Sequence, residues 1–308
     1  MAPCSSSSPV VSNDTRSHWK VKASRWCACA AFQHGSSTSL HTSGRRRDRT
    51  NRHADLRSVK AVHHRVALAV PCYVDQLRPQ AAQATLTLLE RLGCEVDLRF
   101  DAPCCGQPMS NAGAVQDARA AAARWAASSQ PFEAIVMPSG SCTYHVRHQL
   151  PRLATNGGAH AARVTYELCE FLAGPLARPR LSGRFPYRVA MHLGCHAQRG
   201  LRLGSSTELH QAPAGVMRTL LASLEGITLV PLTRSDECCG FGGSFAVGEP
   251  ELSVAMGRDR LRDATQHAAE VLVSSDPSCL LHLEGIARAQ GTGLRVMHIA
   301  ELLEEATR

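Results

Sequence analysis

Apolar and polar positions alternate in two ways along residues 65–308. Short apolar runs have the length of buried β-strands, and the segments between them carry apolar residues at the spacing of amphipathic helices. In the first half this pattern predicts a strand at 65–70, a helix at 80–92, a strand at 95–98, a turn-rich loop at 101–110, a helix at 111–128, a strand at 134–137 and helical sequence at 165–172. Strands that alternate with helices predict an α/β fold.

The same order of elements recurs in the second half. RVAMHLGC at 188–195 matches RVALAVPC at 65–72 in spacing, at an offset of 123 residues. The pattern then predicts a strand at 228–230, a loop at 237–243, a helix at 252–265, a strand at 270–274, a loop at 276–279 and a helical MHIAELL that mirrors TYELCEFL. This period is too long for a solenoid repeat, so we predict two duplicated lobes, 65–180 and 181–308, with pseudo-two-fold symmetry.

Residues 1–64 differ from the rest in composition. They are rich in Ser, Arg and His, show no hydrophobic periodicity, and carry eleven Lys and Arg against three Asp, which accounts for the whole net charge of +8. We therefore predict a disordered basic tail. The composition is also typical of an organellar transit peptide, and a start assigned too far upstream explains it as simply; both alternatives stay open.

Charge and hydropathy exclude several classes of protein. Residues 65–308 carry 23 cationic and 23 anionic side chains, so the pI near 9.0 does not indicate a nucleic-acid-binding surface. No apolar run approaches the roughly 18 to 20 residues that span a bilayer, and no secretory signal pattern is present. We therefore expect a soluble cytoplasmic protein, in which thirteen cysteines are reduced thiols suited to metal ligation or redox chemistry.

Eight of the cysteines form two matching sets of four. Each half places one cysteine after its first strand, a Cys-Cys-Gly sequence in its central loop and one cysteine after its third strand. The sets are Cys72, Cys104, Cys105 and Cys142 in the first half, and Cys195, Cys238, Cys239 and Cys279 in the second. Loops at the carboxyl ends of parallel strands collect at one edge of the sheet and bind ligands there. The sets therefore predict a metal or redox centre in each lobe rather than buried packing thiols.

The adjacent cysteines favour an iron-sulfur cluster over zinc. Structural zinc sites space their ligands two to four residues apart, because adjacent cysteines point apart and do not easily reach one ion. A multi-iron cluster offers a different iron to each thiolate. Gly106 and Gly240, which follow the pairs, allow a tight turn whose N–H groups approach the sulfurs. Zinc, in one lobe only, remains the alternative.

Long motifs connect the chain to a known family. They are PCYVDQLRP, CCGQPMSNAG and PSGSC in the first half, and HLGCH, ECCGFGGSFAV, PELSVAMGRDR and DPSCLLHLEG in the second. These motifs resemble the bacterial lactate-utilisation protein A family over essentially all of residues 65–308. More broadly, the chain is similar to the CCG-domain (cysteine-rich domain) subunits of heterodisulfide reductase and to the iron-sulfur subunits of glycolate oxidase and anaerobic glycerol-3-phosphate dehydrogenase.

The resemblance implies that the two cysteine sets ligate iron-sulfur clusters of the 4Fe-4S kind, but the chain departs from the broader pattern. In that family each lobe ends with two cysteines separated by two residues, and five cysteines can hold a non-cubane cluster. Here Ser139 stands three positions before Cys142, and Asp276 stands three before Cys279. Oxygen atoms are poor substitutes for a thiolate on iron, so the type and number of clusters stay open.

Other cysteines and histidines could also bind metal, but we do not count them among the predicted ligands. Cys94 and Cys169 are predicted to be packing thiols. His192 is predicted to be mainly structural, whereas His196 is the better candidate for a ligand or a proton relay. The stretch 240–243 lacks the spacing and downstream acid of a dinucleotide fingerprint, and we predict that it is a turn covering the cluster.

The resemblance implies an oxidoreductase subunit that carries electrons in the oxidation of L-lactate to pyruvate. The chain has no flavin or nicotinamide fingerprint and lacks the ferredoxin module of glycolate-oxidase-type subunits. We therefore expect it to be inactive without other lactate-utilisation components, one a ferredoxin-type iron-sulfur subunit, docked near Gln107, Pro108 and the Phe241 turn. Two functional alternatives stay open: a thiol/disulfide redox subunit like that of heterodisulfide reductase, or a glycolate oxidase subunit. A zinc-stabilised scaffold is the non-enzymatic alternative.

Overall fold

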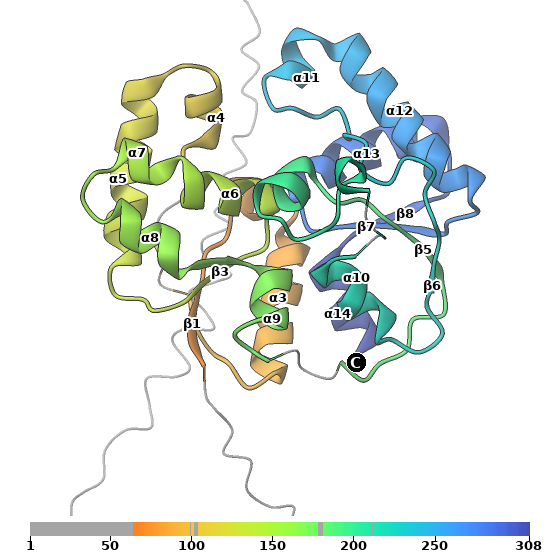
Figure 1. Ribbon diagram of the computed structural model, residues 1–308, viewed down its shortest axis with the longest axis horizontal. Helices are drawn as coiled ribbons and strands as arrows, with labels where there is room; N and C mark the ends of the chain where they lie inside the picture. The colour runs from red at the N-terminus through yellow and green to blue at the C-terminus, as the bar shows by residue number, and fades with distance from the viewer. Residues whose placement is uncertain (1–63, 99, 102–103, 178–180, 211, 213) are drawn as a thin grey trace, which may run out of the picture. The chain divides into compact units, whose positions relative to one another are not determined.

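The computed structural model describes residues 64–98, 100–101, 104–177, 181–210, 212 and 214–308. These residues belong to one of the two units into which the chain divides, Val59–Arg308. Residues 1–63 of the predicted basic tail, with three of the thirteen cysteines, lie outside the described residues. We call the elements within 65–173 lobe one and those within 188–306 lobe two (Figure 1).

The two lobes contain corresponding series of strands and helices. Lobe one consists of β1 (Arg65–Leu68), α2 (Cys72–Leu77), α3 (Pro79–Arg91), β2 (Glu95–Asp97), α4 (Gln107–Asn111), α5 (Val115–Ser129), β3 (Ile135–Met137), α6 (Gly140–His148), α7 (Leu150–Leu153), α8 (Gly158–Val164), β4 (Thr165–Glu167) and α9 (Leu168–Ala173). Lobe two consists of β5 (Arg188–Met191), the π-helix η1 (His196–Gly200), the 3-10 helix η2 (Thr207–Leu209), α10 (Val216–Ala222), β6 (Thr228–Leu229), α11 (Phe245–Gly248), α12 (Pro250–Gln266), β7 (Val271–Ser274), α13 (Pro277–Gln290), β8 (Arg295–His298) and α14 (Ile299–Ala306). None of the helices in the described part of the chain is long and apolar enough to cross a membrane.

Each lobe contains a four-stranded parallel sheet. The strand order is β2-β1-β3-β4 in lobe one and β6-β5-β7-β8 in lobe two, so the two orders are equivalent. The register is equivalent as well, because Ala67 lies opposite Ile135 and Ala190, which is 123 residues further on, lies opposite Leu272. The prediction of two duplicated α/β lobes is confirmed.

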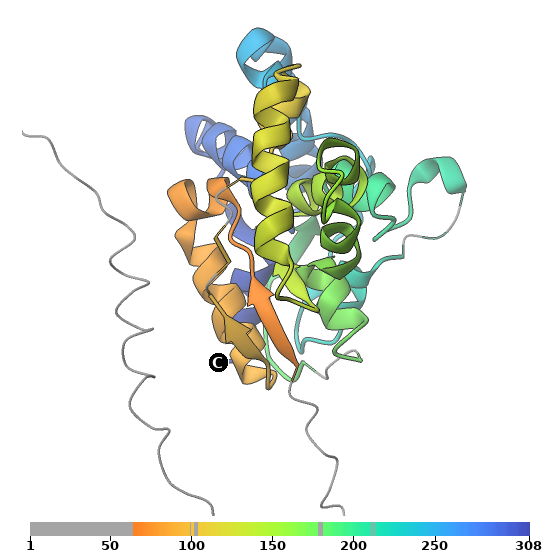
Figure 2. The same ribbon diagram turned by 90° about the vertical axis from the view of Figure 1, so that its left-hand side faces the viewer.

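Strand residues alternate between two faces of each sheet, because successive side chains point in opposite directions. In lobe one, Ala67 and Ile135 pack in one cluster with the fully buried Trp125 of α5. Their neighbours Val66 and Val136 belong to a different cluster on the other face. Figure 2 shows α5, the long yellow helix, beside the orange strand β1.

The inner faces of the two sheets share one hydrophobic core. Val66 and Val136 of lobe one belong to the same cluster of buried side chains as Val189 and Val271 of lobe two. Helices α3, α9, α10 and α14 lie between the sheets and supply much of the remaining apolar surface (Figure 1). Burial of apolar surface therefore stabilises the contact between the lobes as well as each lobe.

The contact between the lobes is symmetric. Helix α3 of lobe one packs against α14 of lobe two, and α10 of lobe two packs against α9 of lobe one. In the duplication α3 corresponds to α10, and α9 corresponds to α14. In each lobe, therefore, the helix that precedes the second strand packs against the last helix of the other lobe. Such a reciprocal contact is the signature of two-fold symmetry, as the repeat predicted. Ion pairs Arg78–Glu284 at 2.9 Å and Arg91–Glu304 at 3.0 Å also join the lobes.

The prediction that 165–172 and 297–303 are helical throughout is wrong. Each segment begins in the fourth strand of its sheet, β4 or β8, and the helix starts only afterwards. The change is made by a capping box, whose N-cap residue is Glu167 in lobe one and His298 in lobe two. The strands exist because they pair with β3 and β7, which is tertiary information that the local pattern lacks.

The loops after the central strands are also more helical than predicted. The predicted loop at 101–110 contains most of α4, and the predicted helix at 111–128 begins as α5 only after Gly113, whose φ of +76° interrupts the helical backbone. Helices α6 and α13 begin directly after β3 and β7, where the sequence predicted loops. This matters for the site because both helices carry a predicted ligand in their first turn.

Candidate metal centre

All eight predicted ligands follow the carboxyl ends of strands. Cys72 is the first residue of α2, and Cys195 directly precedes η1. Cys142 and Cys279 lie in the first turns of α6 and α13. The paired cysteines lie in irregular segments after β2 and β6. The predicted loop placement is therefore correct for the pairs, whereas a helix begins at or around Cys72, Cys142, Cys195 and Cys279.

The four sulfurs of lobe one form a continuous chain of contacts. The Cys104 sulfur is hydrogen-bonded to both Cys72 and Cys105, and Cys105 is hydrogen-bonded in turn to Cys142. The fold thus brings together residues that are up to 70 positions apart in the chain. We call these four residues sulfur set one.

Lobe two repeats the arrangement contact for contact. Cys238 is hydrogen-bonded to Cys195 and Cys239, and Cys239 is hydrogen-bonded to Cys279. In both lobes the first cysteine of the pair contacts the one after the first strand, and the second contacts the one after the third strand. We call these four residues sulfur set two.

Each set stabilises one thiolate and resists further ionisation. Hydrogen bonds from Cys105 and Cys72 lower the pKa of Cys104 to about 2, and hydrogen bonds from Cys195 and Cys239 lower the pKa of Cys238 to about 2. The same contacts, together with burial, raise the pKa values of the donating thiols. Four thiolates at one place therefore require a cation to balance them, which is what a metal centre supplies.

The glycine after each pair has the conformation that the sequence predicted. Gly106 and Gly240 have φ values of +92° and +87°, and their N–H groups donate to the sulfurs of Cys104 and Cys238 at 3.4 Å. Phe241 N–H donates to Cys239 at 3.5 Å. Such N–H groups partly neutralise a thiolate and tune the potential of any cluster that it binds.

The two sulfur sets open into one cavity of about 370 Å³. Every predicted ligand except Cys104 lines it, and the walls come from both lobes. Across the cavity, the ring of Tyr73 in lobe one meets the ring of Phe241 in lobe two edge to face, with centroids 5.9 Å apart. The described lining contains no Lys or Arg. Gln107 and Pro108, predicted to lie near a partner, also line this cavity.

The two positions where the family pattern has a further cysteine are helix N-caps in this chain. Ser139 accepts a hydrogen bond from Cys142 N–H at 3.3 Å and caps α6. Asp276 accepts from Ser278 N–H at 3.2 Å and from its hydroxyl at 2.6 Å, and so caps α13. The Asp276 carboxylate also accepts from Ser141 N–H of lobe one at 2.6 Å. Because its oxygens already accept these hydrogen bonds, Asp276 is a brace between the lobes rather than a free ligand.

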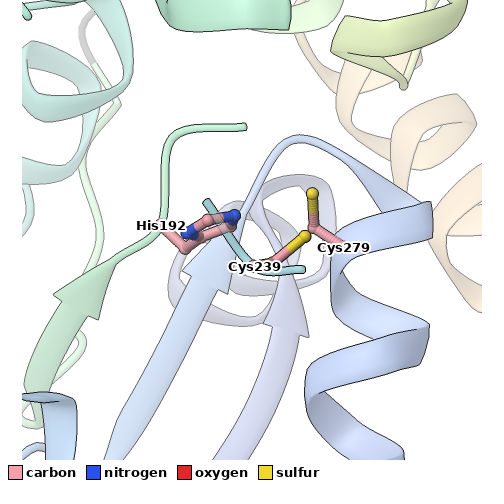
Figure 3. Close-up of side chains that lie close together, drawn as sticks. All are labelled: His192, Cys239 and Cys279. Carbon is pink, nitrogen blue, oxygen red and sulfur yellow. The ribbon is translucent and has the colours of Figure 1, made fainter. Parts of the chain in front are cut away.

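His192 lies at sulfur set two. One of its ring nitrogens and the sulfurs of Cys239 and Cys279 all lie within 4.8 Å of one another, and Figure 3 shows the three side chains turned toward a common space. The residue is 1% exposed, and burial lowers the pKa of its imidazole to about 3. That His192 is mainly structural stays a prediction, and the structure adds that its side chain lies next to two predicted ligands.

Three other histidines lie near the sulfurs. His196 Nδ1 lies 3.8 Å from the sulfur of Cys195, and its ring packs against Tyr144 of lobe one. His145 on α6 is buried near Cys104, and burial lowers its pKa to about 4. The equivalent residue of lobe two, His282, contacts the carbonyl of Ser253 instead. The sequence analysis missed His145 and His282; the signal was a histidine three positions after the last cysteine of each set.

Cys94 and Cys169 lie away from the sulfur sets. Both belong to the core shared by the two sheets. Burial raises the pKa of Cys94 to about 11 and also raises that of Cys169. These positions agree with the prediction of packing thiols.

A family model of the cysteine-rich domain (CCG) matches the chain twice, at residues 66–147 and 189–284. The matches begin in the equivalent strands β1 and β5, and each contains one complete sulfur set. Fold and site together thus define a protein with two cysteine-rich domains that present a metal or iron-sulfur site.

Proteins of similar sequence indicate which family of cysteine-rich-domain proteins this chain belongs to. Lactate utilization protein A of Exiguobacterium sp. is 38% identical over 251 residues, which cover 79% of this chain and 98% of that protein. The proteins of the same name from Bacillus velezensis and Bacillus subtilis are 36% and 35% identical over 245 residues, covering 78% of this chain and 98% of each. The chain belongs to the lactate utilization protein A family and has a role in lactate utilisation.

Solved structures resemble the chain only weakly. An aspartate racemase homologue from Pyrococcus horikoshii OT3 gives a TM-score of 0.30 at 10% identity, over 78% of this chain and 96% of that one. Allantoin racemase from Pseudomonas fluorescens gives 0.28 at 13% identity, over 78% and 88%. These likenesses carry no argument about the site.

Proposed function

We propose that this chain is the iron-sulfur electron-transfer component of a complex that oxidises L-lactate to pyruvate. The observation that carries the proposal is the pair of matching four-sulfur sets that open into one cavity. Oxidation of lactate to pyruvate releases two electrons and two protons. Iron-sulfur clusters, when bound, accept electrons singly, so two centres suit a two-electron donor.

The residues present fit such clusters. Each set supplies four sulfurs from three separate segments, and an adjacent pair of cysteines suits several irons better than one zinc ion. Backbone N–H groups after the pairs already point at the sulfurs, at 3.4 to 3.5 Å. These donors stabilise negative charge on the ligands.

The cavity itself does not suit lactate as a substrate. Enzymes that bind a small carboxylate usually supply Arg or Lys, which pair with both oxygens. The described lining of this cavity contains neither. Electrons therefore reach the chain from a partner that carries out the proton and hydride chemistry, and the chain alone is inactive toward lactate.

The rim of the cavity is the proposed docking site for a ferredoxin-type partner. Gln107, Pro108 and Phe241 line the cavity, and Val247 on α11 is 84% exposed at the same edge. An exposed apolar side chain at the mouth of a redox site suits a transient protein contact. A Val247→Glu variant should keep its iron and lose most of its partner-dependent reduction, whereas Leu209→Glu on η2, at 57% exposure and outside the lining, serves as the control.

The central experiment is anaerobic reconstitution. The purified chain is mixed with lactate alone and then with the products of its genomic neighbours, and cluster reduction is followed by electron paramagnetic resonance (EPR). Reduction should require the full set of proteins. Reduction by lactate in the isolated chain would disprove the partner requirement, and purified protein with stoichiometric zinc and no acid-labile sulfide would disprove the iron-sulfur proposal.

A thiol/disulfide reaction is the second candidate, favoured by the shared cavity. A disulfide that enters it meets sulfur ligands from both lobes. A paramagnetic signal that appears in the isolated chain only when a disulfide is added would favour this function over lactate-linked electron transfer.

A further inference from the structure

The imidazole of His192 has no partner for either ring nitrogen among the described residues. The residue follows β5 directly, and its backbone N–H donates to Val273 of β7 at 2.8 Å, so the sheet fixes its position. Nearby Arg260 donates to the carbonyl of Met191 and offers the ring no acceptor. Leaving a buried polar nitrogen without a hydrogen bond destabilises the fold, because the group loses its hydration and gains no partner. A buried ring kept at this cost requires a functional explanation.

The ring faces sulfur set two. A ring nitrogen of His192 and the sulfurs of Cys239 and Cys279 all lie within 4.8 Å of one another (Figure 3). In the described part of the chain, this is the one group of three such residues whose donor atoms are close enough to share an ion. The three donors come from three different segments, so the arrangement is produced by the fold and not by local sequence.

Lobe one has no equivalent. The position that corresponds to His192 is Ala69, which has no donor atom. The buried histidine of lobe one, His145, comes from α6 instead and does not form a comparable group with two sulfurs among the described residues. The two sulfur sets therefore match in their cysteines but differ in their nitrogen donors.

We propose that His192 ligates iron directly in the cluster of sulfur set two, in the role that a further cysteine has in the broader family. Asp276, which occupies the position of that cysteine, is engaged as a helix cap and a brace. The proposal rests on the iron-sulfur function proposed above. It makes the two clusters unequal, because only the cluster of lobe two has a nitrogen ligand. An imidazole is a neutral ligand where a thiolate is anionic, so this cluster has a higher reduction potential than it would have with a fifth cysteine in place of His192.

The test is pulsed EPR on the anaerobically purified protein, in a redox state in which the cluster of sulfur set two is paramagnetic. A directly bound imidazole gives a strong nitrogen hyperfine coupling, and this coupling should change when the protein is made with ¹⁵N-histidine. The unmodified protein suffices for this arm, so the result does not depend on whether a variant folds. Only weak couplings from backbone amides would contradict direct ligation.

Variants assign the coupling to a residue. His192→Cys should keep the iron, lose the strong nitrogen coupling and lower the reduction potential of the cluster of sulfur set two, since an anionic thiolate replaces a neutral imidazole. His145→Ala is the matched control, since His145 is also buried beside sulfurs, and it should leave the coupling in place. Loss of the coupling in His145→Ala, or its persistence in His192→Cys, would overturn the assignment.

Failure of this inference is distinct from failure of the proposed function. In a Cys105→Ser background, which disables sulfur set one, the remaining metal belongs to lobe two. Iron and sulfide without a histidine coupling would refute the role of His192 and leave the iron-sulfur function intact. Zinc in place of iron there would refute both for this lobe.

Discussion

Lobe one and lobe two build the same four-sulfur set in different surroundings. The paired cysteines, the glycine turn and the strand order agree closely between the lobes. The differences lie next to the sulfurs: lobe two has His192 where lobe one has Ala69, and Asp276 where lobe one has Ser139. Duplicated lobes thus preserve the ligands that bind a centre while the residues that tune it diverge.

The largest expected effect comes from removing one ligand in either lobe. Cys105→Ser and Cys239→Ser should each lower the iron and acid-labile sulfide content to about half, because each lobe has its own ligand set. Metal analysis of the two variants, purified anaerobically in parallel, checks this. Complete loss of iron in either variant would show that the two centres depend on one another.

The glycine turns should respond unequally to a methyl group. A Cβ on Gly240 would lie 2.5 Å from the Ser253 carbonyl oxygen and 2.8 Å from Met256 Cβ, whereas a Cβ on Gly106 would have its nearest neighbours at 3.4 Å. Both residues have positive φ. We expect Gly240→Ala to lower the free energy of unfolding by about 3 to 4 kcal/mol and Gly106→Ala by about 1 to 2 kcal/mol. Anaerobic denaturant unfolding measures both, and equal losses would refute the difference.

The two helix caps offer a third comparison. Asp276→Ala removes a carboxylate that accepts from Ser141 and Ser278, and should cost about 3 kcal/mol of stability. Ser139→Ala removes a single cap and should cost about 1 kcal/mol. Both variants should keep their iron if the caps are not ligands. Loss of the lobe-two iron in Asp276→Ala, with the fold intact by circular dichroism, would identify the carboxylate as a ligand after all.

A fourth comparison concerns pH, at the equivalent N-cap residues Glu167 and His298. Burial raises the pKa of Glu167 from 4.5 to about 8, so its contribution to stability is present at low pH and lost as pH rises from 4.5 to 8. Burial lowers the pKa of His298 from 6.5 to about 3, so its contribution is lost as pH falls below 6.5. Each change amounts to about 1.4 kcal/mol per pH unit within its window.

Substitutions distinguish the effect of Glu167 on the pH dependence of stability from that of His298. Glu167→Gln should remove the alkaline loss of stability and leave the acid loss, and His298→Gln should do the reverse. Unfolding free energies measured between pH 5 and pH 8 check both. An unchanged alkaline slope in Glu167→Gln would show that another group causes it.

The ligands could be predicted from the sequence because they follow strands at equivalent places in a repeat. Cys72 and Cys195 end nearly identical strand sequences, and parallel strands bring their carboxyl ends together. The roles of His192 and Asp276 could not be predicted in this way. The sulfurs near His192 belong to Cys239 and Cys279, and a donor to Asp276 belongs to Ser141, 135 residues away. Such partners depend on how separate segments approach, which local patterns do not contain.

The accuracy of the secondary-structure prediction depends on the same difference between local sequence and tertiary contacts. Buried strands such as β1 and β3 have continuous apolar runs and were predicted within one or two residues. Strands β4 and β8 have three and four residues and form because they pair with a neighbouring strand, so the local pattern predicts helix there instead. Short elements that depend on tertiary pairing are where local propensity decides least.

The reciprocal packing of α3 on α14 and of α10 on α9 bears on how such a chain arises. Two copies of a single-lobe protein, related by a two-fold axis, would make these same two contacts, and gene fusion would then add only a peptide link. The link raises the effective concentration of one lobe at the other without dictating the geometry. A fused pair, unlike a homodimer, can also accumulate different substitutions in its two halves. A homodimer has the same residue at equivalent positions of its two subunits. A fused chain can have Ala69 in one lobe and His192 at the equivalent position of the other.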